Sequence, residues 1–402
     1  MGARSEPMVE TTMMRPIALA EDNGPQAGGM GVRSKPMVEA SNVVNAPLVK
    51  DIGSQAGGMG ARSPSRSPNP GGMGARSEPM VEATMMRPIA LAEDNGPQAG
   101  GMGVRSKPMV EASNPGPGPQ RARLPGGRLH LQHGPIDLII KAWGDEVAIE
   151  HAYQMAERRF RTILHELVAE LPLLRRPVSA QRPPAGTTAR RMWQAALSFA
   201  PRFITPMAAV AGAVADEIAS VMASAGGLDK FFVNDGGDIA LWFGVADQEL
   251  WIGIVPDALR HRFAPWVPAA VRIRPADGIG GVATSGWQGR SHSLGIADAV
   301  TVLAENAARA DAAATLIANA VDLDSSAVRR VPASELDPDS DLGDRLVTVA
   351  VGRLSDAECS AALASGVLLA QEYVSRGLIR GAFLFLQGRY AAVGNSRLSL
   401  ST

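Results

Sequence analysis

Hydrophobic and polar positions follow two different patterns along this chain, and the change falls near residue 118. Beyond that point apolar residues recur at the spacings typical of strands and helices, and every Trp, Tyr and Phe of the chain lies there. Before it, the sequence is rich in Gly, Pro, Met and Ser and lacks an apolar periodicity that would bury one face of an element. The pattern predicts a disordered leader over residues 1–118 and a folded domain over residues 119–402.

The first half of the folded part reads as a hairpin, three helices and several strands. Apolar runs on both sides of His133-Gly134-Pro135 predict the hairpin. Residues 145–174 carry apolar side chains at helical spacing after an acidic start, which predicts a long helix. Shorter helices are expected over 189–200 and 207–224. An antiparallel meander is then expected from four runs of strand length, at residues 230–234, 238–244, 249–255 and 270–275.

The second half repeats this logic. Residues 281–304 read as a strand, a loop and a strand, and an alanine-rich helix follows over residues 306–322. A strand, a helix and a closing hairpin are expected over residues 345–352, 356–377 and 381–394. Helices that lie between antiparallel strands predict a layered α+β domain with antiparallel or mixed sheets. If the apolar strands of the closing hairpin are exposed, two copies of the chain could pair through them as a homodimer.

The leader contains a nearly perfect internal copy. Residues 1–42 recur as residues 73–114, with Thr11 replaced by Ala83 as the one change. Structural repeats conserve a buried pattern and let exposed positions drift, whereas here the polar positions are copied as well. The copy therefore indicates a recent duplication of DNA and not a solenoid.

Composition and charge exclude several classes of function. The formal net charge of −1 gives no electrostatic reason to expect a nucleic acid or an anionic membrane as a partner. Cys359 is the single cysteine, so neither an intrachain disulfide nor a thiolate metal cluster is available. The smoothest apolar stretch, residues 203–227, carries Asp216 and Glu217 at its middle, and no secretory signal is recognised at the N-terminus. We expect a soluble, cytoplasmic protein.

Two oxygen-bearing side chains interrupt the alanine-rich helix one turn apart. Asp311 and Thr315 are spaced i and i+4, so their oxygens share one helix face. Rigidly held oxygen ligands suit Mg²⁺, which completes its octahedron with water and substrate phosphates. The same spacing also suits a capping or solvated pair on a surface helix. Both interpretations stand at this point.

Three further segments could contact a ligand. Gly236-Gly237 allows close approach of a phosphate or a ring to the backbone, with Asp238 as an acceptor for a donor on the ligand, although the pair also suits a plain turn. Thr284, Ser285 and Gly286 offer hydroxyls and a bare backbone at a strand end, as many ordinary loops do. His292 could serve as a general base near neutral pH, or as a polar loop residue.

Taken in order, these segments resemble the ApbE superfamily of FAD:protein FMN transferases, and more closely its shorter, cytoplasmic branch. The resemblance covers about residues 121–395. The Ala-Asp-Ala-x-Ala-Thr motif of the superfamily falls on Asp311 and Thr315, and it implies that both are Mg²⁺ ligands. The Gly-Gly-Asp and Thr-Ser-Gly segments imply cofactor-binding roles for the corresponding residues, Gly236, Gly237, Asp238, Thr284, Ser285 and Gly286.

The resemblance also has departures. The Ala-Lys-Gly helix of the family resembles residues 210–216, which assigns the metal-binding backbone carbonyl to Val210 but places Ala211 where the family has lysine. The His-x-x-Asp-Pro-x-Thr-Gly loop is absent, and His292 stands near its place. The resemblance implies a Mg²⁺-dependent, FAD-binding protein that transfers FMN to the hydroxyl of an acceptor protein. The alternatives are a non-catalytic flavin- or cofactor-binding accessory protein in sulfur or redox metabolism, and a structural domain without flavin.

Overall fold

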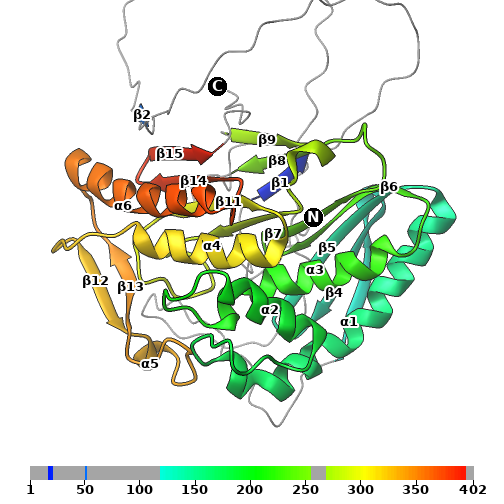
Figure 1. Ribbon diagram of the computed structural model, residues 1–402, viewed down its shortest axis with the longest axis horizontal. Coiled ribbons are helices and arrows are strands. Elements are labelled where there is room, and N and C mark those ends of the chain that lie inside the picture. Colours follow the sequence, from blue (N-terminus) through cyan, green and yellow to red (C-terminus); the bar gives the residue numbers. More distant parts are fainter. Residues whose placement is uncertain (1–16, 21–49, 52–117, 255–268, 395–402) are drawn as a thin grey trace, which may run out of the picture.

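The computed structural model describes residues 17–20, 50–51, 118–254 and 269–394 (Figure 1). Its described part is an α+β fold, as predicted, built around one large antiparallel sheet with helices packed on one face. The strands of this sheet lie in the order β2 (Lys50–Asp51), β15 (Arg389–Gly394), β14 (Gly381–Leu386), β11 (Ala299–Ala304), β10 (Gly281–Ser285), β7 (Asp238–Phe243), β6 (Leu228–Asp235), β5 (Ile136–Gly144), β4 (Arg128–His133) and β3 (Gln120–Leu124).

Most of the sheet consists of two four-stranded units with the same connectivity. In the first, the hairpin β4–β5 is followed by helices and then by the hairpin β6–β7; in the second, β10–β11 is followed by helices and then by β14–β15. In each unit the second strand pairs with the third, and the units join where β7 pairs with β10. The strand order therefore places the junction between the units near the middle of the sheet.

The helices cover one face of the sheet and supply the larger core. They are α1 (Glu146–Leu174), α2 (Thr187–Leu197), α3 (Val210–Ala223), α4 (Ala307–Ala320) and α6 (Asp356–Ser375). Buried side chains of these helices form one apolar cluster with alternate residues of the strands, such as Leu138, Val233 and Val302. The predicted hairpin, the long first helix and the alanine-rich helix are thus confirmed.

The other face of the sheet is covered by a second, smaller sheet. It consists of β1 (Ile17–Ala20), β8 (Leu250–Ile254) and β9 (Ala269–Ile273). The expectation of a continuous meander from β6 to β9 is therefore wrong, because β7 pairs with β10 and β8 leaves the large sheet. The physical reason is that this face is apolar too: Ile239 and Leu241 pack in one buried cluster with Ile252 and Val271.

A small peripheral unit completes the described part. The strands β12 (Val328–Pro332) and β13 (Leu346–Val351) pair with each other, and α5 (Ala333–Leu336) lies between them in the sequence. Short 3-10 helices occupy Pro125–Gly127, Pro206–Ala209 and Pro275–Asp277. In the closing hairpin, β14 is buried along its whole length and β15 pairs with β2, and the homodimer stays a prediction.

Two short strands are the described part of the leader before residue 118. β1 pairs with β8 and β2 pairs with β15, and the disordered leader over residues 1–118 stays a prediction. The rest of the repeat, residues 1–42 and 73–114, lies outside the described residues. Among described helices, the stretch Pro206–Ala223 is apolar and long enough to cross a membrane, but half of it is buried in the fold, and a core helix passes the same test.

Candidate functional site

The turn between β6 and β7 carries the paired glycines. Gly236 and Gly237 adopt φ angles of 59° and 110°, a region that favours glycine. The Asn234 side chain accepts a hydrogen bond from the Gly237 N–H at 2.8 Å and fixes the turn. Asp238 follows as the first residue of β7 and is buried. The sequence therefore places a buried carboxylate directly after a bare stretch of backbone.

The Thr-Ser-Gly segment lies beside this turn. Asp238 Oδ1 accepts a hydrogen bond from the Thr284 N–H at 3.2 Å, which joins the two predicted segments across β7 and β10. The Thr284 hydroxyl pairs with that of Thr301 at 2.9 Å, on the face covered by the second sheet. Because side chains alternate along a strand, Asp238 and Ser285 point toward the helix layer instead. Gly286 is required here, since a Cβ atom would lie 2.3 Å from the Asp298 carbonyl oxygen.

Asp311 lies at the junction of α3 and α4. It is buried, and its Oδ2 accepts a hydrogen bond from the Gly212 N–H at 3.1 Å. The two helices touch through their backbones, because a Cβ on Gly212 would stand 2.3 Å from the Ala307 carbonyl oxygen. Val210, two residues before Gly212, starts α3 at this junction, and Thr315 is half-buried one turn further along α4. The fold thus brings residues 210–212 to the Asp311 helix.

Asp216 makes the reciprocal contact, which sequence analysis did not assign. Its carboxylate accepts hydrogen bonds from the Ala307 N–H at 3.0 Å and the Ala308 N–H at 2.8 Å, and so caps the first turn of α4. Burial raises the pKa of Asp216 to about 6, and these two backbone bonds oppose the rise. The available signal was spacing, since an aspartate follows four residues after Gly212 and again four after Ala307.

A second carboxyl stands on the other side of the glycine turn. Asp235 is the last residue of β6, pairs across the hairpin with Asp238, and is buried. Burial raises its pKa to about 8, opposed by the charge of Arg290 and reinforced by that of Asp238. The Arg290 guanidinium lies over the turn, because a Cβ on Gly236 would stand 2.3 Å from its Nη2. Sequence analysis missed both residues, although acids flank the glycine pair on each side.

His292 belongs to the loop that links β10 to β11. The loop is anchored on the last turn of α4, where the Asn319 side chain accepts hydrogen bonds from the Leu294 N–H at 2.9 Å and the Ser293 hydroxyl at 3.2 Å. His292 itself is half-buried. Its role as a base remains a prediction.

The predicted residues therefore form two groups. Gly236, Gly237, Asp238, Thr284, Ser285 and Gly286 lie at one end of the large sheet. Val210 and Asp311 lie where α3 and α4 meet, with Thr315 one turn further along α4, and His292 lies in the loop after β10, outside both groups. Within the described residues, no three His, Cys, Asp or Glu side chains converge as they would in a carboxylate- or imidazole-rich metal centre. A metal at the second group would depend instead on one carboxylate, one hydroxyl and one carbonyl oxygen.

Comparisons with known proteins agree with the family expected from the sequence. The profile of the family described as "AbpE bacteria" matches residues 121–397. A UPF0280 protein of Methanothrix thermoacetophila is 38% identical over 154 residues, which are 37% of this chain and 60% of the relative. A UPF0280 protein of Archaeoglobus fulgidus is 38% identical over 107 residues, 27% of this chain and 40% of the relative. The matches thus span less than two thirds of these relatives.

A further match is a solved structure. It is the apo form of Pseudomonas stutzeri flavinyl transferase ApbE, with 13% sequence identity and a TM-score of 0.30. The alignment covers 69% of this chain and 94% of that structure. A similarity this low transfers no residue or geometry of that protein to this chain.

Proposed function

The chain belongs to the family described as "AbpE bacteria", and we propose that it binds FAD together with Mg²⁺ and transfers the FMN half to a hydroxyl of an acceptor protein. The observation that carries the proposal is the hydrogen bond between Asp311 and Gly212, because it joins two segments 99 residues apart that the resemblance pairs as metal-binding. The cytoplasm is the proposed compartment, since Cys359, the single cysteine, is free and buried.

The residues at the α3–α4 junction offer the type of donor atom that a hard cation binds. The carboxylate of Asp311, the hydroxyl of Thr315 and the backbone carbonyl of Val210 are oxygen donors, and oxygen is the ligand type that Mg²⁺ prefers. Two helices in backbone contact hold the Asp311 carboxylate and the Val210 segment in place. When bound, Mg²⁺ would neutralise the negative charge of the diphosphate.

The glycine turn supplies the second part of the proposed site. Gly236 and Gly237 form a turn without side chains, and the Arg290 guanidinium lies over Gly236, where it would offer a positive charge to a diphosphate. Asp238 and Ser285 point to the helix layer, where they could accept from and donate to the nucleotide. These residues would bind and orient FAD.

The proposed transfer is a substitution at phosphorus. The hydroxyl oxygen of the acceptor bonds to the phosphorus of the FMN half, and the bond from that phosphorus to the bridging oxygen breaks, so AMP leaves with the electron pair. His292 takes the proton of the acceptor hydroxyl as general base. The role of the chain is to hold the diphosphate in line with that hydroxyl and to exclude water.

A binding titration tests the proposal before any activity is measured. FAD is titrated with and without Mg²⁺ into the full-length protein, its Asp311→Asn variant and an Asp247→Asn control in an exposed loop. We expect Mg²⁺ to tighten FAD binding in the parent and the control but not in Asp311→Asn, by roughly tenfold or more. Equal Mg²⁺ dependence in all three proteins would remove the metal assignment, and no FAD binding at all would remove the function.

A second candidate function is flavin binding without transfer. It is favoured by Ala211, which stands where the family motif has lysine, and by the absence of the His-x-x-Asp-Pro-x-Thr-Gly loop. The two functions differ in one product, since transfer releases AMP and binding does not. Chromatography of AMP after incubation with FAD, Mg²⁺ and a cell extract as the source of acceptor protein separates them.

A further inference from the structure

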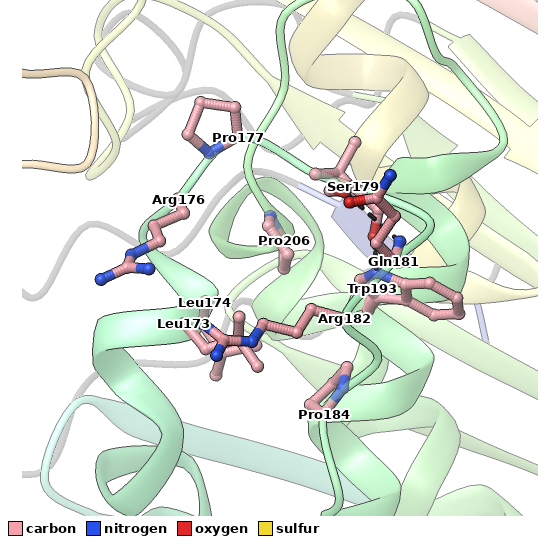
Figure 2. A pocket seen from close by; sticks show the side chains of 11 residues that line it. Leu173, Leu174, Arg176, Pro177, Ser179, Gln181, Arg182, Pro184, Trp193 and Pro206 are labelled. Atoms are coloured by element: carbon pink, nitrogen blue, oxygen red, sulfur yellow. Dashed lines mark hydrogen bonds between the residues drawn. The ribbon is translucent and has the colours of Figure 1, made fainter.

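A cavity of about 360 Å³ lies at the C-terminal end of α1, and none of the residues of the glycine turn lines it (Figure 2). It opens to solvent and is bordered by the end of α1, the loop leading to α2, one side chain of α2 and the start of the 3-10 helix Pro206–Ala209. Figure 2 shows Arg176 and Trp193 on opposite sides, with Arg182 and Pro206 between them. Nothing in the proposed function uses these residues.

The walls of the cavity are fixed by the surrounding fold. Leu174 and Pro206 are buried and form part of its apolar lining. The Trp193 indole N–H donates to the Ser179 carbonyl at 2.8 Å, and the Val178 N–H donates to the Ile204 carbonyl at 2.9 Å. These bonds tie the loop down on both sides, so the cavity does not depend on a ligand to form.

The charged residues that line the cavity are both arginines, Arg176 and Arg182, and its lining includes no acidic residue. Acidic side chains contact the segments behind it, as Glu170 does when it accepts from the Ala185 and Gly186 N–H groups. Residues 171–215 contain six arginines and no Asp, Glu or Lys, although the whole chain has a formal net charge of −1. Four of the arginines have partners within the described residues, namely Arg175 with Asp339, Arg190 with Pro184, Arg191 with Glu217 and Arg202 with Glu372. The guanidinium groups of the two that line the cavity, Arg176 and Arg182, make no hydrogen bond or ion pair with any described residue. The backbone N–H of Arg176 donates to the Leu173 carbonyl at 3.2 Å.

We propose that this cavity binds an aromatic phosphate monoester. A phosphate monoester carries about −1.5 to −2 charges at neutral pH, which matches two guanidinium groups, and the planar fork of arginine suits its oxygens. The indole of Trp193 and the rings of Pro177 and Pro206 offer flat apolar surfaces for the aromatic part. The inference does not rest on the proposed function, because it involves neither the glycine turn nor the α3–α4 junction.

The test uses phenyl phosphate as the probe on the full-length protein. Its dissociation constant is measured by calorimetry for the parent and for the double variant Arg176→Ala/Arg182→Ala. The matched control is Arg158→Ala/Arg353→Ala, which removes two exposed arginines from α1 and from the loop before α6. Phenol and inorganic phosphate are titrated in parallel, and circular dichroism checks that each variant is folded. Trp193→Phe, followed by tryptophan fluorescence, locates the bound probe.

We expect the cavity variant to bind phenyl phosphate roughly tenfold to a hundredfold more weakly than the parent, with no change in the control variant. Phenol and inorganic phosphate should each bind at least as weakly as phenyl phosphate binds the cavity variant. The fluorescence change on binding should disappear in Trp193→Phe. The proposal is overturned if the cavity variant binds like the parent, if inorganic phosphate binds as tightly as phenyl phosphate, or if Trp193→Phe keeps the full fluorescence change.

Discussion

The two regions proposed to form the flavin site both contain a pair of buried or half-buried aspartates, but the pairs are arranged in opposite ways. At the α3–α4 junction, Asp216 and Asp311 each accept from backbone N–H groups of the other helix. At the glycine turn, Asp235 and Asp238 face each other across a hairpin. The pKa of Asp216 rises to about 6 and that of Asp235 to about 8. Backbone donors at helix starts stabilise the charged form, whereas a neighbouring carboxylate opposes it.

The largest expected effect is a difference in pH dependence between the two regions. A carboxyl whose pKa is raised in the folded protein stabilises the fold below its unfolded pKa of 3.8, and this stability is lost as the pH rises through the folded pKa. As the pH rises from about 4 to about 8, Asp235 should therefore lower the free energy of unfolding by several kcal/mol, at about 1.4 kcal/mol per pKa unit. Chemical denaturation across this range should show a flatter profile for Asp235→Asn than for the parent.

The same experiment separates the two regions. Asp216→Asn should flatten the profile only between about pH 4 and pH 6, because its folded pKa is the lower one. If Asp216→Asn also flattened the profile up to pH 8, or Asp235→Asn left it unchanged, the contrast between the junction and the turn would be lost.

A steric change at the contact between α3 and α4 should affect the stability of the fold slightly less than the titration of Asp235 does. A methyl group on Gly212 would meet the Ala307 carbonyl at 2.3 Å, so Gly212→Ala should force α3 and α4 apart and destabilise the fold by about 2–3 kcal/mol. Urea denaturation measures this, with Gly118→Ala as the control, since no atom lies within 4 Å of a Cβ there. A stable Gly212→Ala protein would show that the helices are not in tight contact.

The reciprocal hydrogen bonds should also be energetically coupled. Asp216→Asn weakens the hydrogen bonds that α3 accepts from α4, and Asp311→Asn weakens the one that α4 accepts from α3. The double variant should lose less stability than the sum of the losses in the two single variants, by about 1 kcal/mol. A double-mutant cycle by urea denaturation measures the coupling. Strict additivity would indicate that the two caps act independently.

The smallest effect concerns Arg290 at the glycine turn. Its charge opposes the rise in the pKa of Asp235, so Arg290→Ala should move the titration midpoint of Asp235 upward by a fraction of a pH unit. Carbon-detected NMR of the aspartate carboxyl groups follows this directly, with Arg353→Ala as the control. A downward shift would mean that Arg290 does not face this carboxyl.

Much of the local structure could be predicted from the sequence, because long periodic segments determine their own elements. The helix at Glu146–Leu174 and the alanine-rich helix at Ala307–Ala320 both follow from apolar spacing and end signals. The departure of β8 from the large sheet could not be predicted, since a strand that is apolar on both faces fits either layer. The sequence at Val328–Pro332 is partly polar and half-exposed, so it gave no strand signal.

The segments of the candidate site could be named from the sequence, whereas the contacts between them could not. The glycine pair and the Thr-Ser-Gly segment were recognised, and the fold joins them through Asp238 and the Thr284 N–H. The capping role of Asp216 and the position of Arg290 over Gly236 depend on contacts between residues more than fifty positions apart, which spacing along the chain does not encode. The orientation of Thr284 away from the helix layer depended on strand register for the same reason.

The reciprocal hydrogen bonds between α3 and α4 affect how the protein unfolds. Each helix belongs to a different four-stranded unit, and each lends a carboxylate to the other. If one four-stranded unit unfolded alone, the helix of the other unit would lose the carboxylate that accepts from its backbone N–H groups. Those N–H groups would then have no acceptor. The halves should therefore melt in a single cooperative step, as one body and not as two domains in tandem.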